Sequence, residues 1–246
     1  MKKITFIFAI SLSLLFTSCL SLVAKEIKGN GKLTKQSISI SNFSQIEIET
    51  CVTLDYSQEK NTGKLEFTVD NNLLEYYDIY TKGDVLHIGL KKEYKPRTWL
   101  NPTKSLITVS SEQLEHVEIA GSSVVNFCTD FTSKKLNIEL AGSGKIMANK
   151  YPVKIQDCEI EIAGSGSVQL KGAIQKANVE IAGSGNVKAL DCNIARLNIE
   201  IAGSGNVEAH VTDKLAVEIA GSGNVKYTGN PSVDTDIAGS GRVKKL

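Results

Sequence analysis

Residues 197–207 read Leu-Asn-Ile-Glu-Ile-Ala-Gly-Ser-Gly-Asn-Val, and variants of this stretch recur along the second half of the chain. Seven copies of its Ala-Gly-Ser core follow one another at intervals of 18–22 residues. The alanines of the seven copies are Ala120, Ala141, Ala163, Ala182, Ala202, Ala220 and Ala238. Six copies continue to a second glycine, and the first has Ser123 at that position. A near-constant period of this kind indicates a repeat architecture.

Apolar and polar residues alternate on both sides of each Gly-Ser-Gly segment. In the copy above, Ile199 and Ile201 precede the corner and Val207 follows it. Such period-two alternation predicts a β-strand on each side, with one face buried. The glycines supply the backbone freedom that a tight corner needs. Each copy is therefore expected to fold as strand, corner and strand.

A unit of this size buries its apolar face only by stacking on its neighbours, about 4.8 Å apart in a parallel sheet. Helical repeats are longer, at about 33–47 residues, and a leucine-rich spacing is absent. The sequence therefore predicts an all-β fold, a parallel β-helix or β-solenoid, right-handed by the rule for parallel crossovers. Cys158 falls in an inward column with Leu136 and Leu197, which predicts a core role. Glu115 interrupts that column, so the regular helix is expected to begin there.

Three segments are expected along the chain. Residues 1–24 read as a signal peptide, residues 25–112 as irregular β-rich coils, and residues 113–246 as the regular β-helix. The last two are expected to form one continuous unit. Residues 45–54 already mimic one coil, with Thr50 and Cys51 near the corner position.

The N-terminus carries features of an export signal. Lys2 and Lys3 precede an apolar run over residues 4–16, which is shorter than the roughly 20 residues that span a bilayer. Cleavage after Ala24 and lipidation of Cys19 are both consistent with the residues that follow. The protein is expected to be exported to the periplasm, the outer-membrane surface or the medium. It would contact a membrane only if lipidated Cys19 were its mature N-terminus.

Composition argues against several functions. The formal net charge of +1 does not favour a nucleic-acid partner. The five cysteines form no Cys-x-x-Cys pair, and the three histidines are isolated in sequence from any metal-binding or nucleophile motif. The sequence therefore predicts no metal site, no cofactor and no catalytic centre.

An acidic column is the most distinctive candidate site. An acid stands two residues before each repeat alanine: Glu118, Glu139, Glu161, Glu180, Glu200, Glu218 and Asp236. Alternation places them all on the outer face, where like charges at strand spacing repel. One interpretation is a stripe that binds cations or basic ligands. The favoured one is a solvated face that prevents edge pairing. Asn186, Asn206 and Asn224 are expected to stack as a structural ladder.

A second candidate lies in the loop 93–102, which holds Tyr94 and the single tryptophan, Trp99. An exposed aromatic pair could stack on a sugar or anchor a protein partner. Alternatively, the tryptophan could plug the seam between irregular and regular coils.

Several segments resemble a known family. Residues 42–48, 70–74 and 83–88, followed by the Ala-Gly-Ser-Gly series, are similar to the autotransporter adhesin head GIN domain family of exported Bacteroidetes proteins. The resemblance implies a β-helical fold and an adhesin role, and it carries over no catalytic residues.

The expected function is a non-enzymatic cell-envelope binding module that presents a repetitive surface to an extracellular glycan or protein. One alternative is a polysaccharide-active lyase or hydrolase, since β-helices often host such enzymes. Another is an envelope scaffold or stress-response component. Self-association through the C-terminal end, residues 242–246, is also an expectation.

Overall fold

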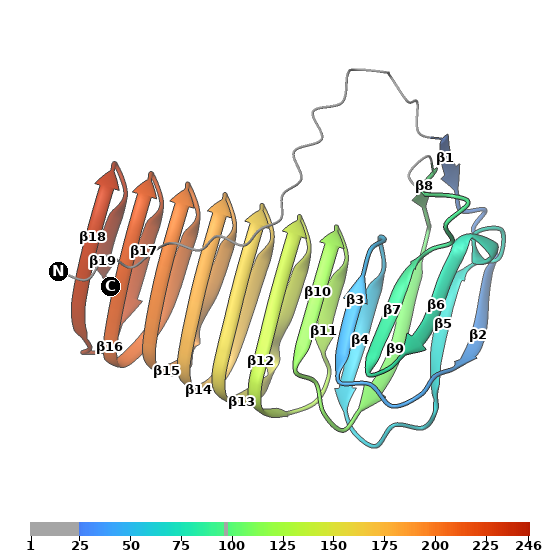
Figure 1. Ribbon diagram of the computed structural model, residues 1–246, viewed down its shortest axis with the longest axis horizontal. Coiled ribbons are helices and arrows are strands. Elements are labelled where there is room, and N and C mark those ends of the chain that lie inside the picture. Colours follow the sequence, from blue (N-terminus) through green and yellow to red (C-terminus); the bar gives the residue numbers. More distant parts are fainter. Residues whose placement is uncertain (1–24, 96–97) are drawn as a thin grey trace.

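The protein folds as one long stack of β-strand rungs (Figure 1). The computed structural model describes residues 25–95 and 98–246, so the predicted signal peptide and the predicted lipidation site at Cys19 lie outside the described residues. Besides strands, this part of the chain contains one 3-10 turn, η1 (Leu74–Tyr76). Parallel pairing of successive repeats confirms the predicted parallel β-helix.

The strands of the N-terminal half are β1 (Lys25–Lys28), β2 (Leu33–Ser39), β3 (Gln45–Ile48), β4 (Thr53–Gln58), β5 (Lys64–Asp70), β6 (Tyr77–Lys82), β7 (Val85–Leu90), β8 (Thr98–Asn101) and β9 (Ser105–Ser111). Those of the repeat region are β10 (His116–Gly121), β11 (Val124–Phe127), β12 (Phe131–Gly142), β13 (Lys145–Gly164), β14 (Ser167–Gly183), β15 (Asn186–Gly203), β16 (Asn206–Gly221), β17 (Asn224–Thr228), β18 (Ser232–Gly239) and β19 (Arg242–Lys245).

The repeats stack in exact register at the glycine corner. Ala182 pairs with Ala202 and Ala202 with Ala220, and every other repeat alanine is aligned in the same way. Hydrogen bonding continues through the corner itself, because Ser204 N–H donates to Gly183 C=O at 2.8 Å. The corner therefore leaves few backbone groups without partners, which is a requirement wherever a chain turns inside a stack.

Each of the two glycines is required for its own reason. Gly203 has φ +129°, and a Cβ there would lie 2.5 Å from the carbonyl oxygen of Gly183. At Gly205 a Cβ would lie 2.7 Å from Cγ2 of Ile181 in the rung below. The first glycine therefore permits both the backbone conformation and the close approach of rungs. The second makes room for the isoleucine column.

Ser123, which replaces the second glycine in the first repeat, has a structural explanation. Its side chain is fully buried, and its hydroxyl donates to Thr50 C=O and accepts from Val52 N–H. The rung beneath it has Thr50 and Cys51 at its corner instead of Gly-Ser. The serine thus satisfies backbone groups of an irregular corner that a second glycine would leave unpaired.

The inward columns form a continuous apolar core. Ile199, Ile201 and Val207 are 1–2% exposed, and Cys158 is buried as predicted, at 3%. Full burial of each such aliphatic side chain contributes about 1.5–3 kcal/mol. Coil length varies at the opposite corner, where the register shifts between Ala148 and Val153 and at equivalent points in later coils. The 18–22-residue spread therefore leaves the glycine corner undisturbed.

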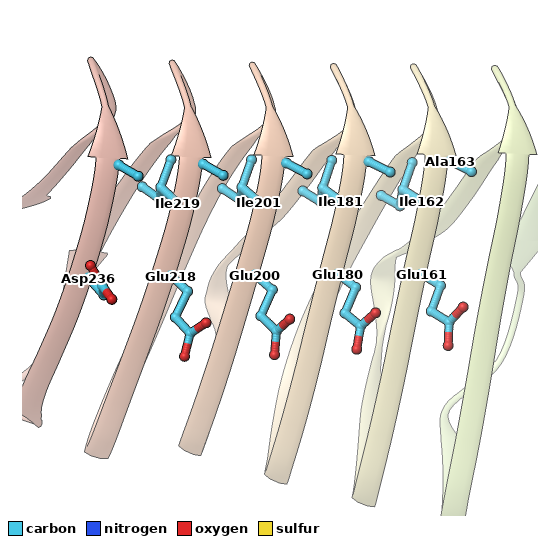
Figure 2. Close-up of a pocket in the computed structure, with 14 residues that line it drawn as sticks. Glu161, Ile162, Ala163, Glu180, Ile181, Glu200, Ile201, Glu218, Ile219 and Asp236 are labelled. Atoms are coloured by element: carbon cyan, nitrogen blue, oxygen red, sulfur yellow. The ribbon is translucent and has the colours of Figure 1, made fainter. Parts of the chain in front are cut away.

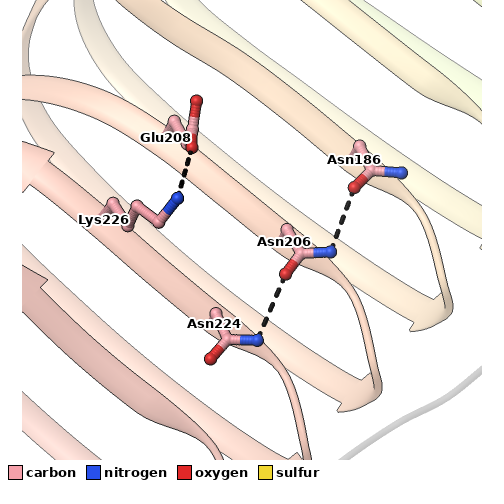
Figure 3. Close-up of polar contacts among 5 residues, drawn as sticks. All are labelled: Asn186, Asn206, Glu208, Asn224 and Lys226. Atoms are coloured by element: carbon pink, nitrogen blue, oxygen red, sulfur yellow. Dashed lines mark hydrogen bonds and ion pairs between the residues drawn. The ribbon is translucent and has the colours of Figure 1, made fainter.

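The predicted asparagine ladder is confirmed (Figure 3). Asn206 Nδ2 donates to Asn186 Oδ1 at 3.1 Å, and Asn224 Nδ2 donates to Asn206 Oδ1 at 3.2 Å. Beside this ladder Lys226 Nζ pairs with Glu208 Oε1 at 3.0 Å. The asparagine ladder thus links three successive rungs at the residue that follows the second glycine of each corner.

The regular stack extends further toward the N-terminus than the sequence suggested. Strands β3 and β4 pair in parallel with β10 and β11, aligning Ile48 with Ile119. The expectation that regularity begins at Glu115 is wrong, because Leu114 is buried there and Glu115 is exposed. The next strands, β7 and β9, also pair in parallel with β3 and β4.

Beyond those rungs the pairing changes from parallel to antiparallel. Strand β6 runs antiparallel to β7, β5 antiparallel to β9, and β2 antiparallel to β5. Strands β6 and β7 form a hairpin, whereas the other antiparallel pairs join strands that are distant in sequence, and this arrangement differs from the irregular coils expected there. They cover the end of the core at the right of Figure 1. Strands β1 and β8 form a separate two-stranded parallel sheet at the same end.

We expect the substitution Gly203→Ala to lower the free energy of unfolding by about 2–4 kcal/mol, because it forces both backbone strain and a clash with the rung below. Gly83→Ala is the matched control, since Gly83 also has positive φ (+62°) but no atom lies within 4 Å of its Cβ position. The control should lose only about 1 kcal/mol. Denaturant unfolding of the mature chain measures both, and equal losses would contradict the close-approach argument.

Candidate functional site

The acidic column forms a straight ladder across the outer face of one sheet. Parallel pairing aligns each acid with the next, from Glu118 and Glu139 through to Glu218 and Asp236. Figure 2 shows Glu161, Glu180, Glu200, Glu218 and Asp236 on successive strands, with their carboxylates on the same side. The predicted outward placement is confirmed, and strand spacing sets the carboxylate repeat at about 4.8 Å.

Register adds one acid that sequence spacing missed. Glu47 of β3 pairs directly with Glu118, so the column begins one rung earlier. Aligning Ile48 with Ile119 in the sequence would have revealed it, because Glu47 then falls two residues before Glu49, which takes the position of the repeat alanine. We refer to the whole column as the acid ladder: Glu47, Glu118, Glu139, Glu161, Glu180, Glu200, Glu218 and Asp236.

A shallow groove runs alongside the acid ladder. Two residues after each acid, an alanine also faces outward, and its small side chain leaves a hollow beside the longer acids (Figure 2). The groove spans five rungs, from Ala163 to Ala238, and is open to solvent along its length. One wall is acidic and the floor is apolar. An extended ligand with a positive edge would match this shape and charge.

The ladder is electrostatically strained. Burial raises the pKa of Glu200, and the carboxylates of Glu180 and Glu218 on adjacent rungs raise it further. Burial likewise raises the pKa of Glu161, with added repulsion from Glu139 and Glu180. A bound cation would relieve this repulsion, whereas an anionic ligand would increase it. Glutamates arranged in this way act as hydrogen-bond acceptors when ionised.

The same combination of burial and repulsion is found at Glu118, near the N-terminal end of the acid ladder. Burial raises the pKa of Glu118, and the neighbouring carboxylates of Glu139 and Glu47 add to the shift. Glu47 also contacts His87, whose Nδ1 lies 2.8 Å from Glu47 Oε2. The ring of His87 in turn stacks on Tyr80 at a centroid distance of 5.0 Å. An aromatic pair therefore closes the N-terminal end of the ladder.

The structure places Tyr94 and Trp99 away from the acid ladder's repeat region. Tyr94 packs against Tyr76, with ring centroids 4.5 Å apart. Trp99 lies on β8 at the end of the molecule opposite β18, and it is 58% exposed. The interpretation that this tryptophan plugs a seam between coils is therefore wrong. Its exposed ring remains a candidate partner contact on a different surface.

Two of the cysteines, Cys158 and Cys192, are buried in the core, whereas Cys51 and Cys128 are half-buried. In the described part of the chain, Cys51, Cys128, Cys158 and Cys192 are all free thiols. Burial raises the pKa of Cys158 and of Cys192 to about 12 in each case. Thiols that stay protonated are poor nucleophiles, so these two act as small apolar fillers.

Together, the fold and this surface define a class: a β-solenoid that displays an acid-lined groove on one flat face. The chain belongs to the family described as "Putative auto-transporter adhesin, head GIN domain", whose model matches residues 42–231. The adhesin-type family is one of exported or surface proteins. Within residues 25–95 and 98–246, none of the helical structure is long and apolar enough to traverse a bilayer.

Solved structures of similar proteins share the fold. A "putative lipid binding protein" from Parabacteroides distasonis ATCC 8503 is 27% identical with a TM-score of 0.75, over 90% of this chain and 100% of that one. A "putative adhesin" from Parabacteroides merdae ATCC 43184 is also 27% identical, with a TM-score of 0.68 over 91% and 100% of the two chains. A "putative adhesin" from Bacteroides fragilis NCTC 9343 is 23% identical, with a TM-score of 0.79 over 89% and 100%. A search of curated proteins found no match.

The strain in the ladder predicts a pH-dependent effect of Glu200→Gln. Because the folded-state pKa of Glu200 is raised, the folded chain binds more protons than the unfolded chain in that window, and stability falls as pH rises through it. The variant should therefore be more stable than wild type near neutral pH, by about 0.5–1 kcal/mol. The gain should vanish at about pH 3, below the ordinary glutamate pKa of about 4.3, because the carboxyl is then protonated in both the folded and the unfolded chain.

Denaturant unfolding at both pH values measures this effect. The control is Glu112→Gln, which removes the same charge from an exposed position outside the ladder. It should change stability little at either pH. An equal gain for Glu200→Gln at both pH values would contradict repulsion as the cause.

Proposed function

We propose that this protein is a non-enzymatic, exported binding module of the cell envelope, and that its acid ladder and alanine groove receive a positively charged segment of an extracellular partner. The main observation in support of this proposal is the groove, which has an acidic wall and an apolar floor along five rungs. Adhesin-like relatives support a binding role. Export to the periplasm, the outer-membrane surface or the medium is part of the proposal.

Repetition along the groove supports binding over catalysis. General acid–base chemistry needs carboxylates in different environments, so that one is protonated while another is ionised. Here the same glutamate recurs on adjacent rungs with the same neighbours, from Glu161 to Glu218. A series of equivalent acceptors suits an extended, repetitive or sliding contact. It does not favour a single cleavage position on a polysaccharide.

The outer face of this sheet is negatively charged along the acid ladder and mostly positively charged along a parallel column of residues. A second outward column, four residues before the acids, is largely basic, and consists of Lys135, Asp157, Lys176, Arg196 and Lys214. Between the two columns lie mostly neutral side chains such as Asn178 and Asn198, which hydrogen-bond across the rungs at 3.1 Å. A partner is therefore oriented by charge, with its basic edge over the acid ladder.

The proposal predicts that removing charge from the ladder weakens partner binding. The triple variant Glu180→Gln, Glu200→Gln and Glu218→Gln should lose at least tenfold in affinity for a basic extended probe such as an oligolysine peptide. Surface plasmon resonance of the mature chain at low salt measures it. Raising the ionic strength should weaken wild-type binding in parallel, because exposed charge pairs are screened.

A matched triple variant separates site from net charge. Glu112→Gln, Asp191→Asn and Asp213→Asn remove the same charge from exposed positions outside the ladder and should bind like wild type. The same instrument should then be used with glycans, matrix proteins and lipid vesicles. Saturable binding that is lost only in the ladder variant supports the proposal. Turnover of a polysaccharide, or equal loss in both variants, would overturn it.

A further inference from the structure

A second, smaller site lies where the first repeat rung meets the next. On β10, His116 and Glu118 are two residues apart and face outward together. On β12, Asn137 pairs with His116 and Glu139 pairs with Glu118. The four side chains therefore occupy the corners of one square of the sheet, and all four are partly buried.

Three of these corners already converge. One ligand atom each from His116, Glu118 and Glu139 lies within 4.8 Å of the other two. His116 Nδ1 is 4.0 Å from Glu139 Oε1. In a tetrahedral zinc site with bonds of 2.0–2.2 Å, ligand atoms stand about 3.4 Å apart. Small rotations of two glutamate side chains would therefore close the set around an ion.

The fourth corner provides an independent observation. Asn137 Oδ1 is buried and lacks a hydrogen-bond partner within the described structure. A buried acceptor without a partner costs free energy, and a water or an ion at this position would satisfy it. Asn137 pairs with His116 across the strands and stands two residues before Glu139 on its own strand. A neutral amide oxygen on this neighbouring residue is of the type that can complete a set of four ligands.

We propose that His116, Glu118 and Glu139, with Asn137 beside them, bind a divalent transition-metal ion of the zinc class. Imidazole nitrogen together with carboxylate oxygen selects such ions over calcium and magnesium, which prefer oxygen alone. The ion would also neutralise the part of the acid ladder where Glu118 stands next to Glu47 and Glu139. The site is distinct from the alanine groove, which begins at Glu161.

Zinc titration of the tag-free, chelator-stripped mature chain tests this inference by isothermal titration calorimetry near neutral pH. One Zn²⁺ should bind per chain, and His116→Ala should weaken binding at least tenfold. His210→Ala is the matched control, because His210 lies in a different part of the fold, where its Nδ1 contacts Thr228 Oγ1 at 2.8 Å. It should bind zinc like wild type.

Two further variants separate a defined site from general attraction to acids. Glu139→Gln should weaken zinc binding, whereas Glu200→Gln, further along the ladder, should not. Equal weakening by both, or several ions bound per chain, would overturn the proposal. So would wild-type affinity in His116→Ala.

A spectroscopic measurement covers the case in which His116→Ala fails to fold. With Cu²⁺ as the probe, the wild-type electron paramagnetic resonance spectrum should show coupling to an imidazole nitrogen, and His87→Ala and His210→Ala should keep it. A spectrum with oxygen ligands alone would refute a histidine-containing site. Partner binding is measured in the presence of a chelator, so the two proposals fail or succeed independently.

Discussion

Everything in this protein depends on how closely the rungs approach at the glycine corner. The first glycine of each corner lies so near the carbonyl oxygen below that a methyl group would overlap it, at 2.3–2.8 Å from Gly142 onward. Only at this separation can the corner N–H groups reach the rung beneath. The corner fixes the register, and the register aligns every other column, whether apolar, acidic or amide.

Register converts a periodic sequence into continuous surfaces. A single outward glutamate is an ordinary solvated residue, but in-register stacking turns one glutamate per rung into a ladder with mutual repulsion. The alanine that follows each acid becomes the floor of a groove in the same way. Burial and repulsion raise the pKa of Glu161 and Glu200, because keeping these carboxylates ionised side by side costs free energy. A cationic partner would lower that cost.

The N-terminal strands give the stack a beginning. Strands β3, β4, β7 and β9 continue the parallel rungs, and β2, β5 and β6 then run antiparallel across the end. These antiparallel strands cover apolar side chains at the end of the core, and the outermost strand, β2, pairs only with β5. This end also carries the Tyr80–His87 stack and the exposed Trp99. The two candidate partner surfaces therefore lie at different places on the molecule.

The parallel stack, the inward columns, the outward acids and the asparagine ladder are all predictable from the sequence, because each follows from a short local pattern repeated at a nearly fixed offset. The arrangement of the segments that lack such a pattern depends on contacts between residues far apart in the sequence, and only the folded structure shows it. The predicted coil at residues 45–54 is confirmed, but the next parallel rung, β7 and β9, and the entry of Leu114 into the core in place of Glu115 follow no repeat pattern. The repeat predicts that Glu118 and Glu139 are neighbours, but His116 has no counterpart in the other copies, so its approach to both acids emerges only from the folded chain.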